Sequence, residues 1–274
     1  MQEAQDRLVA VDRPLAGCAL LTLQRPLASN ALTRAMRLRL VQALAALAQD
    51  GTRVVVLTGA GRAFCAGLDL QELASAPDLA GFAAPGAPDD PVSAVLSFPG
   101  PVIAAVNGAA VTGGLELALA CDVLLASDRA RFADTHAGVG VLPSWGVSQR
   151  LPRLIGRARA LEMSLSGNFI DAGRAAAWGL ANRVVPHDDL LHEALALASA
   201  MLAAAPGLLV QYKRLVDEGL AGTLAQGLAL EAQRARAWAA GLERAQLRAR
   251  PGDPPPGGPG AQCNAAPPAR RDSS

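Results

Sequence analysis

The sequence has few aromatic residues and almost no lysine. Aromatic residues make up 3% of the 274 residues, which argues against a nucleic-acid surface built on base stacking. The charge is balanced, with 25 Lys and Arg against 24 Asp and Glu, so no broad basic face is expected. Lys213 is the single lysine, and alanine is abundant. We interpret both features as a coding bias rather than as a sign of function.

Cysteine is also scarce, and long apolar runs are missing. The four cysteines lack the spacing of a metal site, and we interpret them as reduced thiols: Cys18, Cys65, Cys121 and Cys263. No apolar run reaches the roughly 18 residues that a membrane-spanning helix needs. The N-terminal stretch MQEAQDRLVA carries charges where a signal peptide would be apolar. These absences predict a cytoplasmic protein that binds neither membrane nor nucleic acid.

The chain does contain short apolar runs that alternate with helical patterns, and this alternation predicts an α/β fold with right-handed crossovers. Strands are expected at 8–11, 19–23, 54–58, 102–106, 123–126 and 184–185. Helices are expected at 33–49, 115–120, 157–165, 171–178, 188–205 and 223–240. A turn is expected at 14–17, glycine-rich loops at 59–67 and 107–114, and a mobile surface loop at 74–91.

Two glycine-rich turns are the first feature with chemical meaning. Residues 61–70 read GRAFCAGLDL and residues 107–117 read NGAAVTGGLEL, each after a predicted buried strand. A glycine turn that leads into a helix leaves backbone N–H groups free. Two such turns at neighbouring strand ends can direct two N–H groups at one oxygen, as in an oxyanion hole. Spacing alone favours the simpler explanation, in which the glycines only permit tight turns and close packing.

Further motifs accompany these turns in a fixed order. They are LTLQRP at 21–26, NAL at 30–32, VVVLTG at 54–59, PVIAAVNG at 101–108, CD at 121–122, GVGVLP at 138–143 and QRL at 149–151. Together, from about residue 7 to about residue 240, they make the chain resemble the crotonase family, also called the enoyl-CoA hydratase/isomerase superfamily. The resemblance implies a crotonase-like ββα superhelix with a C-terminal α-helical segment.

The resemblance also implies a substrate and its binding residues. An acyl-CoA thioester would place its carbonyl oxygen between the backbone amides of Leu68 and Gly113, which would stabilise an enolate. No metal or redox cofactor is expected, because coenzyme A is part of the substrate. The implied contacts with the substrate or its CoA portion are Arg25, Leu27, Ala28, Ala66, Gly67, Asp69 and Trp145. Arg25 is either a phosphate ligand or a solvated arginine, and Trp145 either lines the acyl pocket or belongs to the core.

Hydratases of this family hold one water between two glutamates. The first matches Glu116, near the start of a predicted helix where a carboxylate is favoured; the alternative is a purely structural charge. At the second position stands His136. A histidine there can act as acid or base near neutral pH, or it can be a hydrogen-bonded structural residue. Asp134 is a neighbour that could orient His136 or replace it.

Other departures narrow the expected reaction. Ser144 and Trp145 stand where family isomerases carry their acid, and no aspartate lies between Ala137 and Gln149 for a dehalogenase. We therefore expect a hydratase-like lyase that adds water to a 2-enoyl-CoA. The alternatives are a non-catalytic acyl-CoA-binding homologue and another family reaction such as thioester hydrolysis.

The resemblance finally implies an assembly and a division of the chain. Family members form homotrimers or hexamers made of two trimers. We expect a ββα core over residues 1–190 and a helical trimerisation segment over 191–248. Residues 249–274 contain the sequence PGDPPPGGPG, which cannot bury enough apolar surface to fold, and are expected to form a disordered tail.

Overall fold

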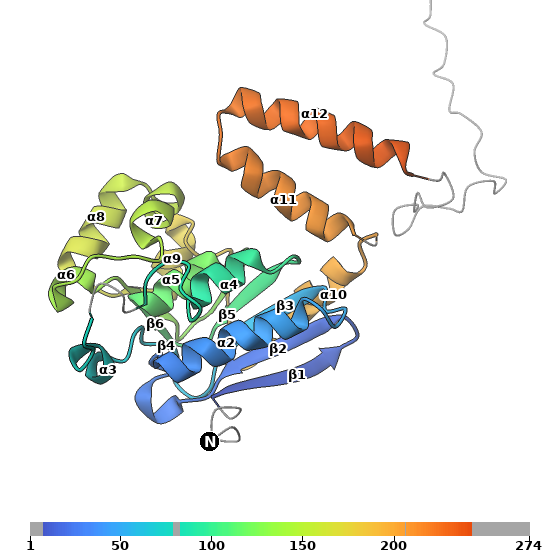
Figure 1. The fold of residues 1–274 in the computed structure, drawn as a ribbon. Helices are drawn as coiled ribbons and strands as arrows, with labels where there is room; N and C mark the ends of the chain where they lie inside the picture. Colours follow the sequence, from blue (N-terminus) through green and yellow to red (C-terminus); the bar gives the residue numbers. More distant parts are fainter. Residues whose placement is uncertain (1–7, 79–82, 206, 243–274) are drawn as a thin grey trace, which may run out of the picture. The chain divides into compact units, whose positions relative to one another are not determined.

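The computed structural model describes residues 8–78, 83–205 and 207–242. The chain forms two compact units, one ending at Arg214 and the other beginning at Leu215, and each is described by itself (Figure 1). In the described part of the first unit, six strands form a larger sheet in the order β1 (Val9–Leu15), β2 (Cys18–Leu23), β3 (Val54–Gly59), β5 (Val102–Val106), β7 (Val123–Ser127), β10 (Arg183–Val185). A smaller sheet has the order β4 (Ala63–Cys65), β6 (Ala109–Val111), β8 (Arg131–Ala133), β9 (Ile170–Asp171).

The described residues also form helices. They are η1 (Pro26–Ala28), α2 (Arg34–Leu47), α3 (Leu70–Ala74), α4 (Pro91–Ser97), α5 (Gly113–Ala120), α6 (His136–Val139), α7 (Val147–Ile155), α8 (Arg157–Ser166), α9 (Ala172–Trp178), η2 (His187–Asp189), α10 (Leu190–Leu202), α11 (Leu208–Leu220) and α12 (Leu224–Ala240). Three successive repeats, β3-β4-α3, β5-β6-α5 and β7-β8-α6, each place one strand in the larger sheet and the next in the smaller. This is the predicted ββα arrangement.

The strands that read as wholly apolar are buried on both faces, as expected. On one face, Met36 and Leu40 of α2 pack in a cluster with Leu57 of β3. On the other face, Ala194 and Ala198 of α10 pack with further strand residues of the same sheet. Figure 1 shows α2 running along the strands of the larger sheet. The larger sheet therefore lies between two helical layers.

The first strand is longer than the sequence predicts. β1 continues to Leu15, so the turn predicted at 14–17 covers only residues 16–17, and the register is irregular between Asp12 and Leu15. β1 is an edge strand of its sheet. Pro14 has no N–H to donate, and an edge strand tolerates this because one of its sides has no neighbouring strand.

Both glycine-rich loops were predicted without regular structure, and this is wrong in part. Residues 63–65 and 109–111 form β4 and β6, which pair in parallel. A strand of three residues carries too little periodicity to be recognised, and it exists only because another short strand lies beside it. The helix α7 was also not predicted, because it contains Pro152 and follows Gly146. The strands β8 and β9 and the helix α11 are further elements beyond the prediction.

Two ion pairs fix segments around these repeats. The guanidinium of Arg37 in α2 binds the carboxylate of Asp89, at 2.6 Å between Nη2 and Oδ2. Lys213 in α11 donates from Nζ to the carbonyls of Phe98 and Gly100 and lies 2.8 Å from Oδ2 of Asp122. The same oxygen accepts the amide of Val102 at the start of β5, so Asp122 has a structural role.

The second unit is described through residue 242. It holds the end of α11 and the helix α12, which begins with a capping box between Thr223 and Gln226. Arg234 of α12 lies 2.5 Å from Glu218 of α11. The predicted tail at 249–274 lies outside the described residues. No helix in the described ranges is long and apolar enough to cross a membrane.

Candidate active site

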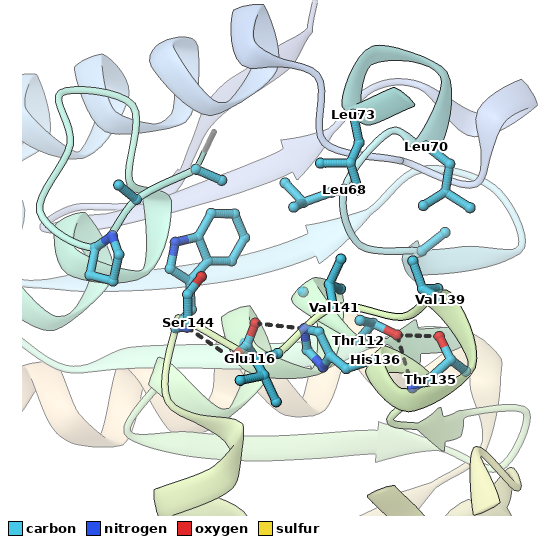
Figure 2. Close-up of a pocket in the computed structure, with 17 residues that line it drawn as sticks. Leu68, Leu70, Leu73, Thr112, Glu116, Thr135, His136, Val139, Val141 and Ser144 are labelled. Atoms are coloured by element: carbon cyan, nitrogen blue, oxygen red, sulfur yellow. Dashed lines mark hydrogen bonds and ion pairs between the residues drawn. The ribbon is translucent and has the colours of Figure 1, made fainter. Parts of the chain in front are cut away.

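A cavity of about 430 Å³ lies beside α5 and α6, the helices of the second and third ββα repeats. Six residues predicted from the sequence line it: Ala66, Leu68, Gly113, Glu116, His136 and Trp145. Figure 2 shows apolar side chains such as Leu73 and Val141 on its wall, with Glu116 and His136 facing each other. The cavity is therefore largely apolar with a polar end, which is the usual character of a small-molecule site.

The amides of Leu68 and Gly113 lie at neighbouring points of the wall. A Cβ placed on Gly113 would be 3.5 Å from the amide nitrogen of Leu68. Gly113 begins α5, so its N–H has no carbonyl partner within the helix. Within the described residues neither amide donates a hydrogen bond. Two neighbouring N–H groups without a partner can donate to one acceptor that enters the cavity.

The two glycines of α5 meet different neighbours. A Cβ on Gly114 would lie 2.1 Å from the carbonyl oxygen of Cys65, so only glycine permits α5 to approach β4 this closely. A Cβ on Gly113 would lie 3.2 Å from Cζ3 of Trp145.

Burial raises the pKa of the Cys65 thiol to about 12, so this thiol is not available as a thiolate near neutral pH.

The residue before Gly113 has an unusual backbone. Thr112 has φ 54° and ψ −113°, a conformation that is strained for a residue with a side chain. Its amide donates to the carbonyl of Ala133 at 2.9 Å. Its hydroxyl lies 2.5 Å from the Thr135 hydroxyl and accepts the Thr135 amide (Figure 2). Sequence reasoning missed Thr112 and Thr135, since no sequence pattern reports a positive φ at a threonine.

Glu116 is 2% exposed, and one oxygen of its carboxylate accepts two hydrogen bonds. Oε1 accepts the backbone amides of Trp145 at 3.0 Å and Val147 at 3.2 Å, and Oε2 lies 3.6 Å from Nε2 of His136. Burial raises the pKa of Glu116 above its usual range, because hydrogen bonds from Val147 and Trp145 and the nearby imidazole only partly offset the loss of water. Glu116 is thus a buried carboxylate that binds a proton more readily than an exposed glutamate does.

His136 is held from the side opposite Glu116. Its Nδ1 lies 2.6 Å from Oδ1 of Asp134, and the same oxygen accepts its backbone amide at 3.2 Å. Burial acts to raise the pKa of Asp134, but hydrogen bonds from His136 and from Ser164 outweigh it and hold this pKa below the usual range. Asp134, His136 and Glu116 therefore form a continuous buried row. The predicted neighbour Asp134 does contact His136, whereas Ser164 on α8 was not predicted.

Trp145 is both a wall of the cavity and a core residue. It is 4% exposed, belongs to the main apolar cluster and lines the cavity. Its indole Nε1 is buried and has no hydrogen-bond partner within the described residues. The two alternatives posed by the sequence are thus not exclusive.

The remaining predicted residues, Arg25, Leu27, Ala28, Gly67 and Asp69, do not line the cavity. Arg25 is part-buried, and its guanidinium binds Asp69 at 3.0 Å and the carbonyl of Ala31; it is not a solvated arginine. Asp69 also caps α3. The segment of Arg25 runs beside the Leu68 segment, through a parallel bridge between Leu32 and Leu68. Leu27 is fully exposed, and Ala28 ends η1 beside it.

Most of the chain is similar to known proteins. Residues 14–245 match the family model described as enoyl-CoA hydratase/isomerase. The chain belongs to the enoyl-CoA hydratase/isomerase family, the crotonases. A relative is the Arabidopsis thaliana protein named "Probable enoyl-CoA hydratase 1, peroxisomal", which is 38% identical over 248 residues, 90% of this chain and 92% of that protein. Family membership confirms the resemblance predicted from the motifs.

Solved structures confirm the crotonase fold. The enoyl-CoA hydratase subunit I of Geobacillus kaustophilus HTA426 has a TM-score of 0.79 and 35% identity, covering 85% of this chain and 90% of that one. A monofunctional enoyl-CoA isomerase of Mycobacterium smegmatis has a TM-score of 0.69 and 38% identity, covering 81% and 97%. The family implies an acyl-CoA substrate. Because both hydratases and an isomerase are similar, the reaction must be argued from the site.

Proposed function

We propose that this crotonase adds water across the double bond of a 2-enoyl-CoA thioester. The observation that carries the proposal is the pair of buried acid–base groups, Glu116 and His136, 3.6 Å apart in the same cavity as two unpartnered amides. Hydration needs one group that takes a proton from water and one that gives a proton to carbon. It also needs donors that stabilise the enolate formed between these steps.

The amides of Leu68 and Gly113 are assigned to the thioester oxygen. When hydroxide adds to the β-carbon, negative charge develops on this oxygen as the enolate forms. Fixed N–H donors in a cavity that excludes water stabilise such charge by about 3 kcal/mol per donor. The strained Thr112, fixed by Thr135, supports this role because it sets the direction of the Gly113 amide.

Glu116 and His136 are assigned to the water. One oxygen of the Glu116 carboxylate accepts hydrogen bonds from two backbone amides. The other lies 3.6 Å from Nε2 of His136. Water held between Oε2 and Nε2 gives its hydroxyl to the β-carbon and a proton to one of the two groups, and the other group gives a proton to the α-carbon. The substrate itself supplies the electronic activation, so no cofactor enters the scheme.

The remaining residues are assigned according to whether they line the cavity or lie outside its lining. Ala66 and Trp145 line the cavity and are assigned to the acyl group. Arg25, Leu27, Ala28, Gly67 and Asp69 are assigned to the CoA portion, since they adjoin the Leu68 segment outside the cavity. The ion pair of Arg25 with Asp69 at 3.0 Å supports an indirect role for Arg25, which fixes this segment.

Loss of the enoyl absorbance of crotonyl-CoA tests the proposal. Wild type should hydrate crotonyl-CoA, and both Glu116→Gln and His136→Ala should lose about 100-fold or more of kcat. Glu162→Gln, an exposed glutamate on α8, is the matched control and should retain wild-type turnover. Turnover that survives in Glu116→Gln would contradict the assigned mechanism.

Thioester hydrolysis is the second candidate, and one observation favours it. A carboxylate that holds Nδ1 of a histidine next to oxyanion donors, as Asp134 holds His136, is also the arrangement that activates nucleophiles in hydrolases. Release of free CoA, detected with a thiol reagent, distinguishes this reaction from hydration. Tight binding of acyl-CoA with neither reaction would indicate a non-catalytic binding protein.

The proposal also includes an oligomeric state and a cellular location. A homotrimer, or a hexamer of two trimers, with residues 191–248 in the contacts is supported by exposed apolar side chains on α11 and α12, namely Val216, Leu220, Leu224 and Leu228. Sedimentation equilibrium tests the mass of the assembly. The cytoplasmic location stays a prediction, which cell fractionation tests.

A further inference from the structure

His136 lies between two carboxylates in the interior of the protein. Asp134 approaches Nδ1 at 2.6 Å and Glu116 approaches Nε2 at 3.6 Å. The exposed fraction is 2% for each of the two acidic residues and 8% for His136. A buried charge without a partner is strongly unfavourable, so the protonation states of these three groups must be considered together.

The second carboxylate beside His136, that of Asp134, changes the net charge and the number of acidic protons in the site. A site with two carboxyl groups that holds one proton carries one net negative charge and one acidic proton. An imidazolium also carries an acidic proton, but it adds a positive charge that a neutral carboxylic acid lacks. An ionised Asp134 cancels this charge. Asp134, protonated His136 and ionised Glu116 then have the same net charge and the same acidic proton as the two-carboxyl site.

We propose that Asp134 and His136 act as one unit that replaces a protonated carboxyl group, with Asp134 as the positioning residue that keeps the imidazole protonated on both nitrogens. This inference rests on the proposed hydration. His136 then gives its Nε2 proton to the α-carbon, and Glu116 takes a proton from the water whose oxygen bonds to the β-carbon. The proton on Glu116 returns to His136 after the product leaves, so the cycle closes without a further reactant.

The surroundings of His136 support this assignment. Asp134 accepts hydrogen bonds from Ser164 and twice from His136, and its lowered pKa keeps it ionised at neutral pH. On α8, which packs against α6, the charged residues Arg157, Arg159 and Glu162 are exposed. On α7, Arg150 donates to the carbonyl of Trp145. Among the described residues, Asp134 and Glu116 are the charged groups that contact the imidazole.

Asp134→Asn is the first test, because it removes the charge and keeps the shape and one oxygen acceptor. We expect kcat to fall by about 100-fold, with KM changed by less than about threefold. The alkaline limb of the kcat–pH profile should move to lower pH, since the imidazolium loses its counter-charge. Ser164→Ala removes a hydrogen bond from Asp134 but no charge, and should leave that limb in place. An unchanged profile in Asp134→Asn would overturn the proposal.

A second test replaces the unit of Asp134 and His136 by a single carboxyl group. His136→Glu alone would place three carboxyl groups together and should be nearly inactive. His136→Glu combined with Asp134→Asn restores a two-carboxyl site, and we expect it to be at least about tenfold more active than His136→Glu alone. Equal activity of the single and double variants would contradict the unit. Circular dichroism and thermal melting ensure that folded proteins are compared.

A measurement without turnover separates this inference from the proposed function. The ring protons of His136, assigned by comparison with His136→Ala, are followed by NMR against pH in wild type and in Asp134→Asn. The pH at which His136 loses its proton should be lower in Asp134→Asn. If wild type fails to hydrate any 2-enoyl-CoA, the proposed function is wrong, while this titration still decides whether Asp134 supports the imidazolium. An unshifted titration would refute the charge pairing.

Discussion

Oε2 of Glu116 lies 3.6 Å from Nε2 of His136, although the two residues belong to different repeats of the fold. Glu116 is on α5, after β5 and β6, and His136 begins α6, after β7 and β8. Because β6 and β8 are paired in parallel, the segments that follow them emerge side by side. The contact between the two acid–base groups is therefore a direct result of the ββα repeat.

Replacement of Glu116 should affect stability in a pH-dependent way. Since its pKa is raised in the folded protein, its favourable contribution is present below the unfolded value of about 4.3 and is lost as pH rises through the folded value. Glu116→Gln keeps an oxygen that can accept the amides of Trp145 and Val147. We expect its melting temperature, relative to wild type, to be higher at pH 8 than at pH 4. A relative loss that grows with pH would contradict this sign.

Replacement of Asp134 should show the opposite dependence. Its pKa is lowered in the folded protein, so its contribution to stability is present above the unfolded value of about 3.9 and is lost as pH falls through the folded value. Asp134→Asn should therefore lower the melting temperature most near neutral pH, and the difference should shrink below about pH 4. Thermal melting from pH 7 down to the acid limit checks this, with Asp171→Asn on the surface as a control.

Alanine at the two glycines of α5 should have different effects. At Gly114 the new Cβ would lie 2.1 Å from the Cys65 carbonyl oxygen, and we expect this backbone clash to prevent stable folding. At Gly113 it would lie 3.2 Å from a Trp145 ring atom and 3.5 Å from the Leu68 nitrogen. Gly113→Ala should therefore fold but lose about 100-fold of kcat, because the methyl group crowds the amides. Melting curves and turnover measured together distinguish the two, and equal melting temperatures would refute the distinction.

The buried ion pair between Arg37 and Asp89 should be important for stability. Arg37→Met would leave the Asp89 carboxylate buried without its guanidinium, which we expect to lower the free energy of unfolding by about 3 kcal/mol. Arg34, whose Nε lies 3.8 Å from the same carboxylate, is exposed. Arg34→Met is the matched control and should cost about 0.5 kcal/mol or less. Urea denaturation measures both, and a similar cost for the two variants would show that burial is not decisive.

The larger elements of the fold could be predicted because their patterns are complete within the sequence. A short run rich in valine such as 54–58 is typical of a strand buried on both faces, and the helix over 33–49 has apolar residues that share one face. The short strands β4, β6 and β8 could not be predicted in this way. Three residues have no periodicity of their own, and each of these strands pairs with a strand of an adjacent repeat.

The prediction of single site residues from the sequence has the same limit. Motif order was sufficient to select Glu116 and the position of His136, and closeness in sequence drew attention to Asp134. The conformation of Thr112 and the hydrogen bond from Ser164 to Asp134 arise from tertiary packing. The sequence likewise gave no indication that Arg25 would be held by Asp69.

The position of Lys213 has a consequence for chemical labelling. It supplies the single lysine amine of the chain, and in the fold that amine is bound to two carbonyls and the Asp122 carboxylate, with the side chain 10% exposed. Reagents that acylate lysine amines, and proteases that cleave after lysine, can act at Lys213 only after these contacts open. The rate of its acylation thus reports how often this part of α11 detaches from Phe98, Gly100 and Asp122, without any probe introduced into the chain.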